Sequence, residues 1–168
     1  MLLAIDTATR LTSLALYDGR DLLAEHSWRT QDSHIQLAPA VQSLMDEAEV
    51  RVNDLTALAV SVGPGSYSGL RVGVSFAKGI AGARGLPLVG FSTLDTLAAA
   101  HPGGSASSAL VTVVLAGRGR VIVQTYKWRK GKWEGRGEPT IMTWDALIES
   151  LDGAATLTGE IDAIGYAA

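Results

Sequence analysis

The chain has 168 residues, of which 47% are apolar and 18% charged, with a net charge of −3 and no cysteine. This length corresponds to one domain or two small ones, and the apolar share is enough for a buried core, which excludes a disordered chain. The lack of cysteine excludes disulfides, thiolate catalysis and cysteine-ligated metal sites. With an acidic balance, no secretory signal and no long apolar run, we expect a soluble cytoplasmic protein rather than a membrane protein or a free nucleic-acid binder.

The first thirty residues predict three antiparallel strands. Apolar runs at residues 2–5, 12–17 and 22–28 are separated by short connections, and Asp18-Gly19 is a strong hairpin signal between the second and the third. An amphipathic helix follows, because apolar residues recur with a period of 3.6 from residue 37 to residue 48.

A strand, a glycine-rich loop and a long helix come next. Residues 58–62 form a short apolar run, residues 63–66 read Gly-Pro-Gly-Ser, and the helical pattern continues to about residue 83. Within that helix, small residues recur every four positions: Gly69, Gly73, Ala77 and Ala81. Such a stripe lets another backbone approach closely, so it indicates either packing on the protein's own sheet or docking of a partner helix.

The second half predicts a smaller lobe. After a strand at 86–91 and a helix at 94–100, a Gly-, Pro- and Ser-rich break predicts a boundary that separates residues 1–103 from 104–168. Strands at 109–115 and 121–128 and a helix at 143–150 follow. The order of elements predicts an α/β protein: a ribonuclease-H-like domain with a mixed sheet and flanking helices, plus a second lobe.

Two stretches have the composition of a binding turn. Asp6-Thr7-Ala8-Thr9 follows the first strand, where a carboxylate and hydroxyls can hold a metal-bound water or a phosphate, although such a turn is also common as a plain turn. The loop at 63–71 offers backbone N–H groups at a helix start, yet it has neither the Lys-Ser/Thr of a P-loop nor the dinucleotide-binding pattern. His34 has Ala38 four residues on, so no histidine pair marks a metal site, and no nucleophile elbow is present.

Charge is unevenly distributed along the second half. Residues 116–136 hold seven basic residues and one acid, whereas residues 137–168 hold six acids and no base. Basic residues alternate with aromatic ones around Trp128 and Trp133, which predicts either contact with a nucleic-acid backbone or a solvated two-stranded ribbon with its aromatic side chains turned inward. The candidate contacts are Lys127, Arg129 and Lys130.

Taken together, these motifs resemble the bacterial TsaB (YeaZ) family. The resemblance covers residues 1–100 closely, is looser through 118–126, and is most specific in the stretch GPGSYSGLR at 63–71. It implies the actin/hexokinase/Hsp70-like superfold and a cytoplasmic, non-catalytic subunit for N6-threonylcarbamoyladenosine at position 37 of tRNA. It also implies pairing with the threonylcarbamoyltransferase TsaD, recruitment of the ATPase TsaE, tRNA contact within the complex, and a homodimer when alone.

The resemblance also indicates what is missing. TsaD-like enzymes carry a metal-binding histidine pair on the helix that begins here at His34, and Ala38 stands at the second position, so we expect no metal and no cofactor. Family members usually carry an Asp before the turn at 115–118, and they extend beyond residue 168, so we expect an incomplete second lobe. The alternative is a glycoprotease-like metallopeptidase or a small-molecule phosphotransferase of the same superfold.

The expected interface and motif residues follow from this reading. Two helices are expected to form the partner surface, through Leu37, Val41, Leu44, Met45, Gly69, Gly73, Ala77 and Ala81. The residues that resemble a binding motif, and that we expect to be structural or vestigial, are Asp6, Thr7, His34, Gly63, Gly65, Ser66 and Arg71.

Overall fold

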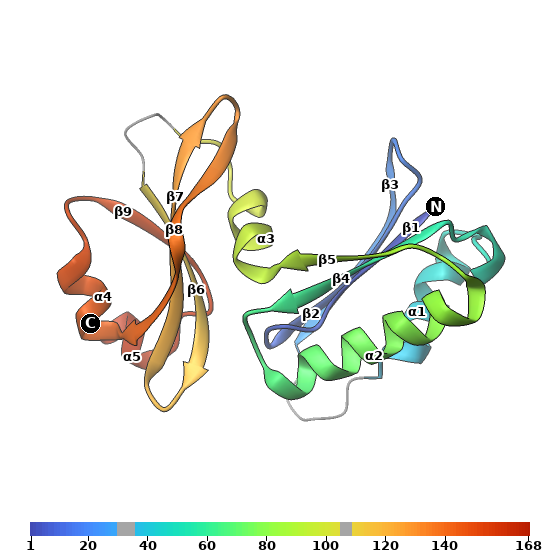
Figure 1. The fold of residues 1–168 in the computed structure, drawn as a ribbon, viewed down its shortest axis with the longest axis horizontal. Coiled ribbons are helices and arrows are strands. Elements are labelled where there is room, and N and C mark those ends of the chain that lie inside the picture. Colours follow the sequence, from blue (N-terminus) through green and yellow to red (C-terminus); the bar gives the residue numbers. More distant parts are fainter. Residues whose placement is uncertain (30–35, 105–108) are drawn as a thin grey trace. The chain divides into compact units, whose positions relative to one another are not determined.

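Two sheets organise the chain (Figure 1). The computed structural model describes residues 1–29, 36–104 and 109–168, and contacts divide them into two compact units, Met1–Phe91 and Ser92–Ala168. Each unit has its own mixed sheet with flanking helices, so the predicted α/β class is confirmed. Among the described residues, no helix has the length and apolar character needed to cross a bilayer.

Unit 1 has a five-stranded sheet in the order β3-β2-β1-β4-β5. The first three strands pair antiparallel, as predicted, and β4 pairs parallel with β1. This order is that of a ribonuclease-H-like sheet. The strands are β1 (Leu2–Asp6), β2 (Leu11–Tyr17), β3 (Leu22–Arg29), β4 (Ala57–Gly63) and β5 (Leu88–Ser92).

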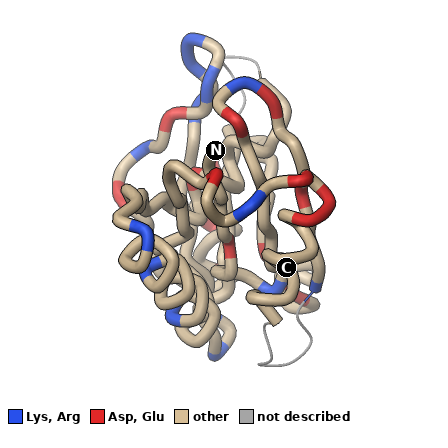
Figure 2. Tube along the Cα trace, turned by 90° about the vertical axis from the view of Figure 1, so that its right-hand side faces the viewer, with Lys and Arg blue, Asp and Glu red and all other residues tan. Residues whose placement is uncertain are grey.

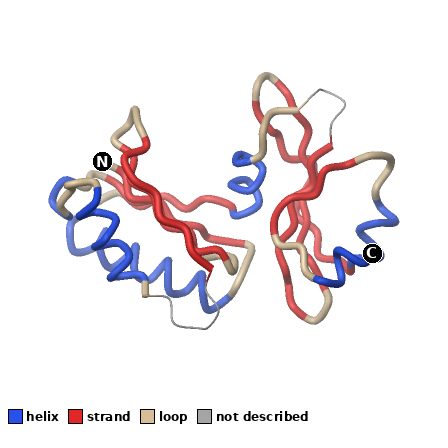
Figure 3. The backbone as a smooth tube through the Cα atoms, turned by 180° about the vertical axis from the view of Figure 1, so that it is seen from behind, coloured by secondary structure: helices blue, strands red, loops and turns tan. Residues whose placement is uncertain are grey.

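Two helices cover one face of this sheet (Figure 3). The helix α1 (Leu37–Glu47) packs against β2 and β3, and α2 (Tyr67–Arg84) packs against β1 and β4. A single turn of 3-10 helix, η1 (Val52–Asp54), precedes β4. The N-cap of α2 is Ser66, whose hydroxyl accepts a hydrogen bond from the Gly69 amide, and Gly85 ends the helix in the left-handed conformation. The local sequence therefore determines both ends of α2.

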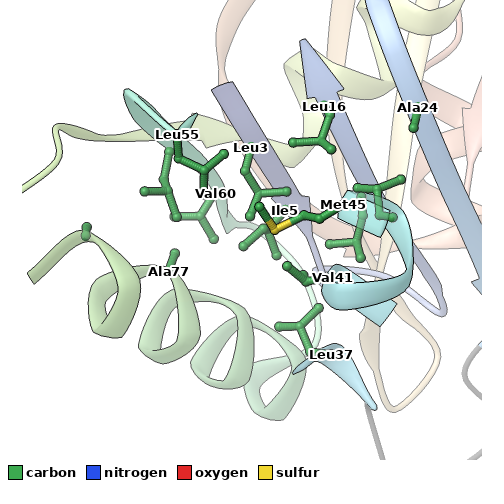
Figure 4. Close-up of a cluster of buried hydrophobic side chains, with 14 residues drawn as sticks. Leu3, Ile5, Leu16, Ala24, Leu37, Val41, Met45, Leu55, Val60 and Ala77 are labelled. Atoms are coloured by element: carbon green, nitrogen blue, oxygen red, sulfur yellow. The ribbon is translucent and has the colours of Figure 1, made fainter. Parts of the chain in front are cut away.

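The core of unit 1 lies between the sheet and these helices (Figure 4). Alternate residues of β1, Leu3 and Ile5, are fully buried, as the period of two in a half-buried strand requires. They meet the apolar stripe of α1, whose spacing of four, three and one residues places it on a single face. Each such aliphatic side chain contributes about 1.5 to 3 kcal/mol through burial. The α1 stripe consists of Leu37, Val41, Leu44 and Met45, all at most 5% exposed.

Unit 2 has a four-stranded sheet in the order β8-β7-β6-β9, with helices on both faces. Its apolar residues form two clusters, one with α4 and one with α3. Only β9 pairs parallel, with β6. The elements are α3 (Thr93–Ala100), β6 (Ala109–Gly117), β7 (Arg120–Arg129), β8 (Lys132–Thr143), α4 (Trp144–Ser150), β9 (Ala155–Gly159) and α5 (Ala163–Ala167).

Two tight hairpins join the three antiparallel strands of unit 2. Gly117 pairs with Arg120 and Arg129 pairs with Lys132, so each connection has two residues. Those residues, Arg118-Gly119 and Lys130-Gly131, all have positive φ, between 48° and 79°. This is the type I′ geometry that suits the twist of a hairpin.

The units divide at a different place from the predicted boundary at residue 103. The division falls between Phe91 and Ser92, ahead of α3. Leu94 and Ala98 of α3 are buried in an apolar cluster on the sheet of unit 2. The helix belongs to unit 2 because it packs there, so the division falls before it and not at the Gly-, Pro- and Ser-rich break.

Three elements of unit 2 are not predicted from the sequence: β8 beyond Trp133, β9 and α5. The strand β8 contains Gly135, Gly137 and Pro139, residues that weaken a strand prediction. It tolerates them because it is an edge strand and bulges there: Val123 pairs with Thr140, but Thr125 pairs with Arg136.

A buried tyrosine ties α3 to the sheet of unit 2. The Tyr126 hydroxyl donates a hydrogen bond to Asp95 Oδ1 of α3 at 2.7 Å, and it lies 3.1 Å from Gln124 Oε1. Tyr126 is 1% exposed, and this burial, reinforced by the Asp95 carboxylate, raises the pKa of the phenol well above its usual value. The folded protein therefore holds the phenol in its neutral, donating form.

Tyr126→Phe should lower the free energy of unfolding at pH 7 by about 1 to 3 kcal/mol, since it removes a buried hydrogen bond to a carboxylate. The pKa is raised on folding, so the wild type loses stability as pH rises above about 10, where only the unfolded phenol ionises. The variant lacks this loss. Urea unfolding at pH 7, 9 and 11 should show the gap between the two proteins narrowing at pH 11; a constant gap would contradict the assignment.

Candidate functional site

The two glycine- and hydroxyl-rich stretches of the sequence meet at the N-terminus of α2. The turn after β1 (residues 6–9) lies against the loop after β4 and the first two turns of α2, because β1 and β4 are parallel neighbours whose carboxyl ends share one edge of the sheet. The Ser66 amide donates to the Ala8 carbonyl at 2.6 Å, and the Thr7 amide donates to Ser61 Oγ at 3.3 Å. We call this assembly the β1–α2 junction.

The polar groups of the turn bond to the protein itself. Asp6 Oδ1 accepts a hydrogen bond from the Ala8 amide at 2.9 Å, and the Thr7 hydroxyl donates to the Gly69 carbonyl at 2.8 Å. Thr9 Oγ1 exchanges hydrogen bonds with the backbone of Leu11. Thr7 is 1% exposed, so its hydroxyl is inside the structure and not available at the surface. Thr7 thus joins the turn to the helix, whereas Asp6 and Thr9 bond to the backbone of the turn and its neighbour Leu11.

Glycine is required in the junction because the backbones touch. A Cβ added at Gly65 would lie 2.1 Å from the Ala8 carbonyl oxygen, and one added at Gly69 would lie 2.1 Å from that of Thr7. At Gly73 the same atom would lie 2.2 Å from Thr7 Oγ1. The space that a ligand-binding loop would leave open is therefore filled by protein. Gly63, with φ of +108°, turns the chain out of β4 into this loop.

The small-residue stripe packs on the protein's own sheet. Gly69, Gly73, Ala77 and Ala81 are the buried residues of α2, and Ala77 and Ala81 belong to the core cluster that contains the α1 stripe. All eight residues expected to form a partner surface are thus inside unit 1. They do not form a surface in the folded chain, because the face of each helix that carries them is the face that covers the sheet.

The outer face of α2 is the exposed counterpart of that stripe. Tyr67 is 75% exposed, and the Arg71 guanidinium lies 5.4 Å from the centre of its ring, in a cation–π arrangement. Arg71, a predicted motif residue, therefore points away from the β1–α2 junction. A shallow hollow on this face is lined by Tyr67, Ser68, Arg71, Val72, Ser75 and Phe76.

Sequence reasoning missed this outer face because it followed the small residues. The available signal was Tyr67 one turn before Arg71, since Tyr and Arg are enriched where proteins bind one another. Gly79 and Gly82 also lie on α2, and a Cβ added at either would meet no atom within 4 Å. Close approach of α2 to another chain is therefore sterically open along this side.

The remaining candidates lie elsewhere. His34 is outside the described residues. Lys127, Arg129 and Lys130 are exposed on the β7–β8 hairpin of unit 2. Among the residues that the structure describes, no group of three or more His, Cys, Asp or Glu side chains is placed to hold a metal ion.

Comparison with known proteins assigns the family. The family model described as "TsaD: tRNA N6-adenosine threonylcarbamoyltransferase" matches residues 29–157, and the chain belongs to this family. A TsaB protein of Bacillus subtilis, named for tRNA threonylcarbamoyladenosine biosynthesis, is 34% identical over 79% of the chain, and one of Escherichia coli is 29% identical over 98%. Within the family, the chain falls in the TsaB (YeaZ) group, as its motifs predict.

Solved structures agree with this assignment. The structure of YeaZ from Pseudomonas aeruginosa has a TM-score of 0.75 and 29% identity over 91% of this chain and 71% of its own. A second, described as an uncharacterized protein with similarity to peptidase YeaZ, has a TM-score of 0.73 and 31% identity over 84% of this chain and 66% of its own. The chain spans 58% of the length of the Bacillus subtilis relative and 70% of the Escherichia coli one.

Gly69→Ala should destabilise the protein by about 1 to 3 kcal/mol, because its Cβ would collide with the Thr7 carbonyl and force the junction apart. Gly79→Ala is the matched control on the same helix. It meets no neighbour and should stabilise by about 0.5 to 1 kcal/mol through helix propensity. Thermal and urea unfolding measure both, and equal stability of the two variants would show that the junction is loosely packed.

Proposed function

We propose that this chain acts in the biosynthesis of N6-threonylcarbamoyladenosine at position 37 of tRNA, as a cytoplasmic, non-catalytic subunit. The observation that carries the proposal is the β1–α2 junction, in which Asp6 and Thr7 each bond to a backbone group of the turn or of α2. Membership of the TsaB group, whose members are named for this pathway, supplies the substrate class. On this reading, the chain supports a TsaD-like threonylcarbamoyltransferase and a TsaE-like ATPase and performs no chemistry of its own.

The junction supports a non-catalytic role in two ways. Asp6 and Thr7 are the side chains that an active relative would direct at a metal-bound water or a phosphate, and here each has a partner within the protein. Gly65 and Gly69 lie in close contact with the backbone of the turn, so the inner side of the loop is closed to a ligand. The metallopeptidase or phosphotransferase alternative would need this junction to open.

Reconstitution tests the proposal directly. The chain, a TsaD-like enzyme and a TsaE-like ATPase, mixed with tRNA, threonine, bicarbonate and ATP, should form the modified nucleoside together with the enzyme that supplies the threonylcarbamoyl group. Omitting the chain should abolish product formation. Product formation that is unchanged without the chain would overturn the proposal.

The chain alone should neither hydrolyse ATP nor cleave a glycoprotein, since the candidate catalytic groups are engaged in the junction. The measurement is turnover across the fractions of a final sizing column. Activity that follows the protein through the column and disappears in Asp6→Ala would favour the enzyme alternative.

The partner surface that we propose is the outer face of α2. It combines an exposed aromatic ring, a stacked guanidinium and glycines with open space above them. Arg71 and Lys78 are exposed basic residues of α2, and the helix has no acidic residue, which favours a partner helix with an acidic face. A TsaD-like enzyme and a second copy of this chain would compete for this surface, so the isolated chain is expected to dimerise.

Arg71→Glu should abolish co-purification of the TsaD-like enzyme and should also leave the isolated chain monomeric, because it reverses the charge of the proposed surface beside Tyr67. Arg20→Glu is the charge-matched control, since Arg20 lies exposed in the β2–β3 turn. It should leave both associations unchanged. Pull-down and light scattering measure them, and capture of the enzyme by a folded Arg71→Glu protein would place the interface elsewhere.

A further inference from the structure

The β7–β8 hairpin carries a concentrated positive charge on one of its faces. Residues that pair across two strands share a face, and along each strand every second residue does. Arg129 pairs with Lys132, and Lys127 pairs with Glu134, so these four side chains point to one side of the ribbon. The exposed basic residues on this side of the ribbon and at its turn are together called the basic face. They are Lys127, Arg129, Lys130, Lys132 and Arg136.

The opposite face of the hairpin holds its aromatic residues. Trp128 pairs with Trp133, and their ring centres are 5.2 Å apart in an edge-to-face arrangement. Trp133 Nε1 donates to the His101 carbonyl at 3.3 Å, and a Cβ added at Gly103 would lie 2.7 Å from the Trp128 ring. Both indoles are thus packed under the segment that follows α3. They are not free to stack on bases, so any contact through the basic face is with charge.

The structure separates this face from the other basic residues of the second half. Arg118 and Arg120 lie at the β6–β7 turn, and Lys130 lies at the β7–β8 turn, at opposite ends of β7 (Figure 1). Ten residues of strand span about 30 Å. The basic segment of the sequence therefore forms two sites, and the β7–β8 turn, the loop at the top of Figure 2, has the larger charge.

The charges of the basic face oppose one another in the isolated protein. Arg129 and Lys132 lie directly across from each other, and Lys130 occupies the turn between them. Like charges placed opposite each other in a sheet destabilise it. Glu134 is the one acid on this face, and its carboxylate is 3.8 Å from the Lys132 ammonium. A polyanion laid along the ribbon would relieve this repulsion.

We propose that the basic face of the β7–β8 hairpin binds the sugar–phosphate backbone of RNA, and this inference rests on the proposed function for the choice of RNA. Successive charges are about 7 Å apart along a strand and about 5 Å apart across the pair, so long side chains can reach successive phosphates. The contact reads no bases, because the indoles face inward. This contact belongs to unit 2, whereas the outer face of α2 belongs to unit 1, and its strength depends on salt.

The salt dependence of tRNA binding tests this proposal. Binding of a fluorescent tRNA to the full chain alone is measured by fluorescence anisotropy at KCl concentrations from about 25 to about 200 mM. Phosphate contacts make affinity strongly dependent on salt in this range. Arg129→Gln with Lys130→Gln removes two charges from the basic face. The slope of log affinity against log salt should fall by about 1.4 to 1.8, since each lost phosphate contact contributes about 0.7 to 0.9.

The matched control removes the same charge from the other end of β7. Arg118→Gln with Arg120→Gln changes the net charge equally, and both residues are exposed. It should leave the slope unchanged. An equal change in both double variants would mean that net charge alone governs binding, and an unchanged slope in the hairpin variant would also overturn the proposal.

A second variant separates binding from folding. Lys132→Glu gains an opposite-charge pair across from Arg129 but loses the ion pair with Glu134, so the melting temperature should change little while affinity for tRNA falls. Unchanged affinity in this variant would overturn the proposal. Unlabelled tRNA should displace the fluorescent tRNA more effectively than polyglutamate at equal charge. More effective displacement by polyglutamate would overturn the proposal, by assigning the basic face to an acidic protein.

The proposed function is judged by a separate readout. Each hairpin variant is also used as bait for the TsaD-like enzyme, and all should capture it as the wild type does. A wild-type chain that fails to capture the enzyme contradicts the proposed function, whereas the tRNA slopes of the chain alone still decide the role of the basic face.

Discussion

The contact between α2 and the turn after β1 is the constraint on which unit 1 depends. Backbone atoms of Thr7 and Ala8 lie so close to the helix that Gly65 and Gly69 cannot carry a side chain. The Thr7 hydroxyl then bonds to the helix backbone across this contact. Because protein interiors are close-packed, this approach aligns α2 on β1 and β4 and leaves the α1 stripe to complete the core.

The same contact explains why motifs that have the composition of a ligand site pack against the protein itself. A carboxylate, hydroxyls and a glycine-rich helix start are the components of a phosphate site, and here Asp6, Thr7 and Ser66 each bond to a backbone group of the turn or of α2. What remains exposed on α2 is a tyrosine, a guanidinium and glycines with free space above them, which is the composition of a docking face. The non-catalytic role that we propose would use such a face for docking rather than an open pocket.

Unit 2 is built differently from unit 1. Helices pack on both faces of its sheet, and the β7–β8 hairpin still exposes one face to solvent. The type I′ turns allow the three strands to follow each other closely, and each turn carries a basic residue in the left-handed conformation. Tyr126 and the paired indoles hold the inner face of the ribbon against α3 and the segment after it. The outer face is left for charge, where three cationic side chains crowd one turn at some cost in local stability.

Much of the fold could be predicted from the sequence because its signals are local. The meander, its Asp18-Gly19 turn and both main helices follow from periodicity and turn chemistry, which act within a few residues. The strand β8 could not, because its glycines and proline are tolerated only at the edge of a sheet whose other strands lie elsewhere in the chain.

The sequence by itself determined which residues make up the candidate sites. The tertiary structure decided which of them are buried, which are exposed and which lie close together. Periodicity placed four small residues on one face of a helix, but only packing on the sheet determines whether that face is buried. These residues are Gly69, Gly73, Ala77 and Ala81. In the same way, the seven basic residues of 116–136 form one run in the chain and two clusters in space, because β7 holds its ends about 30 Å apart. Which side chains are buried and which charges act together depends on contacts between distant segments, and those form only when the chain folds.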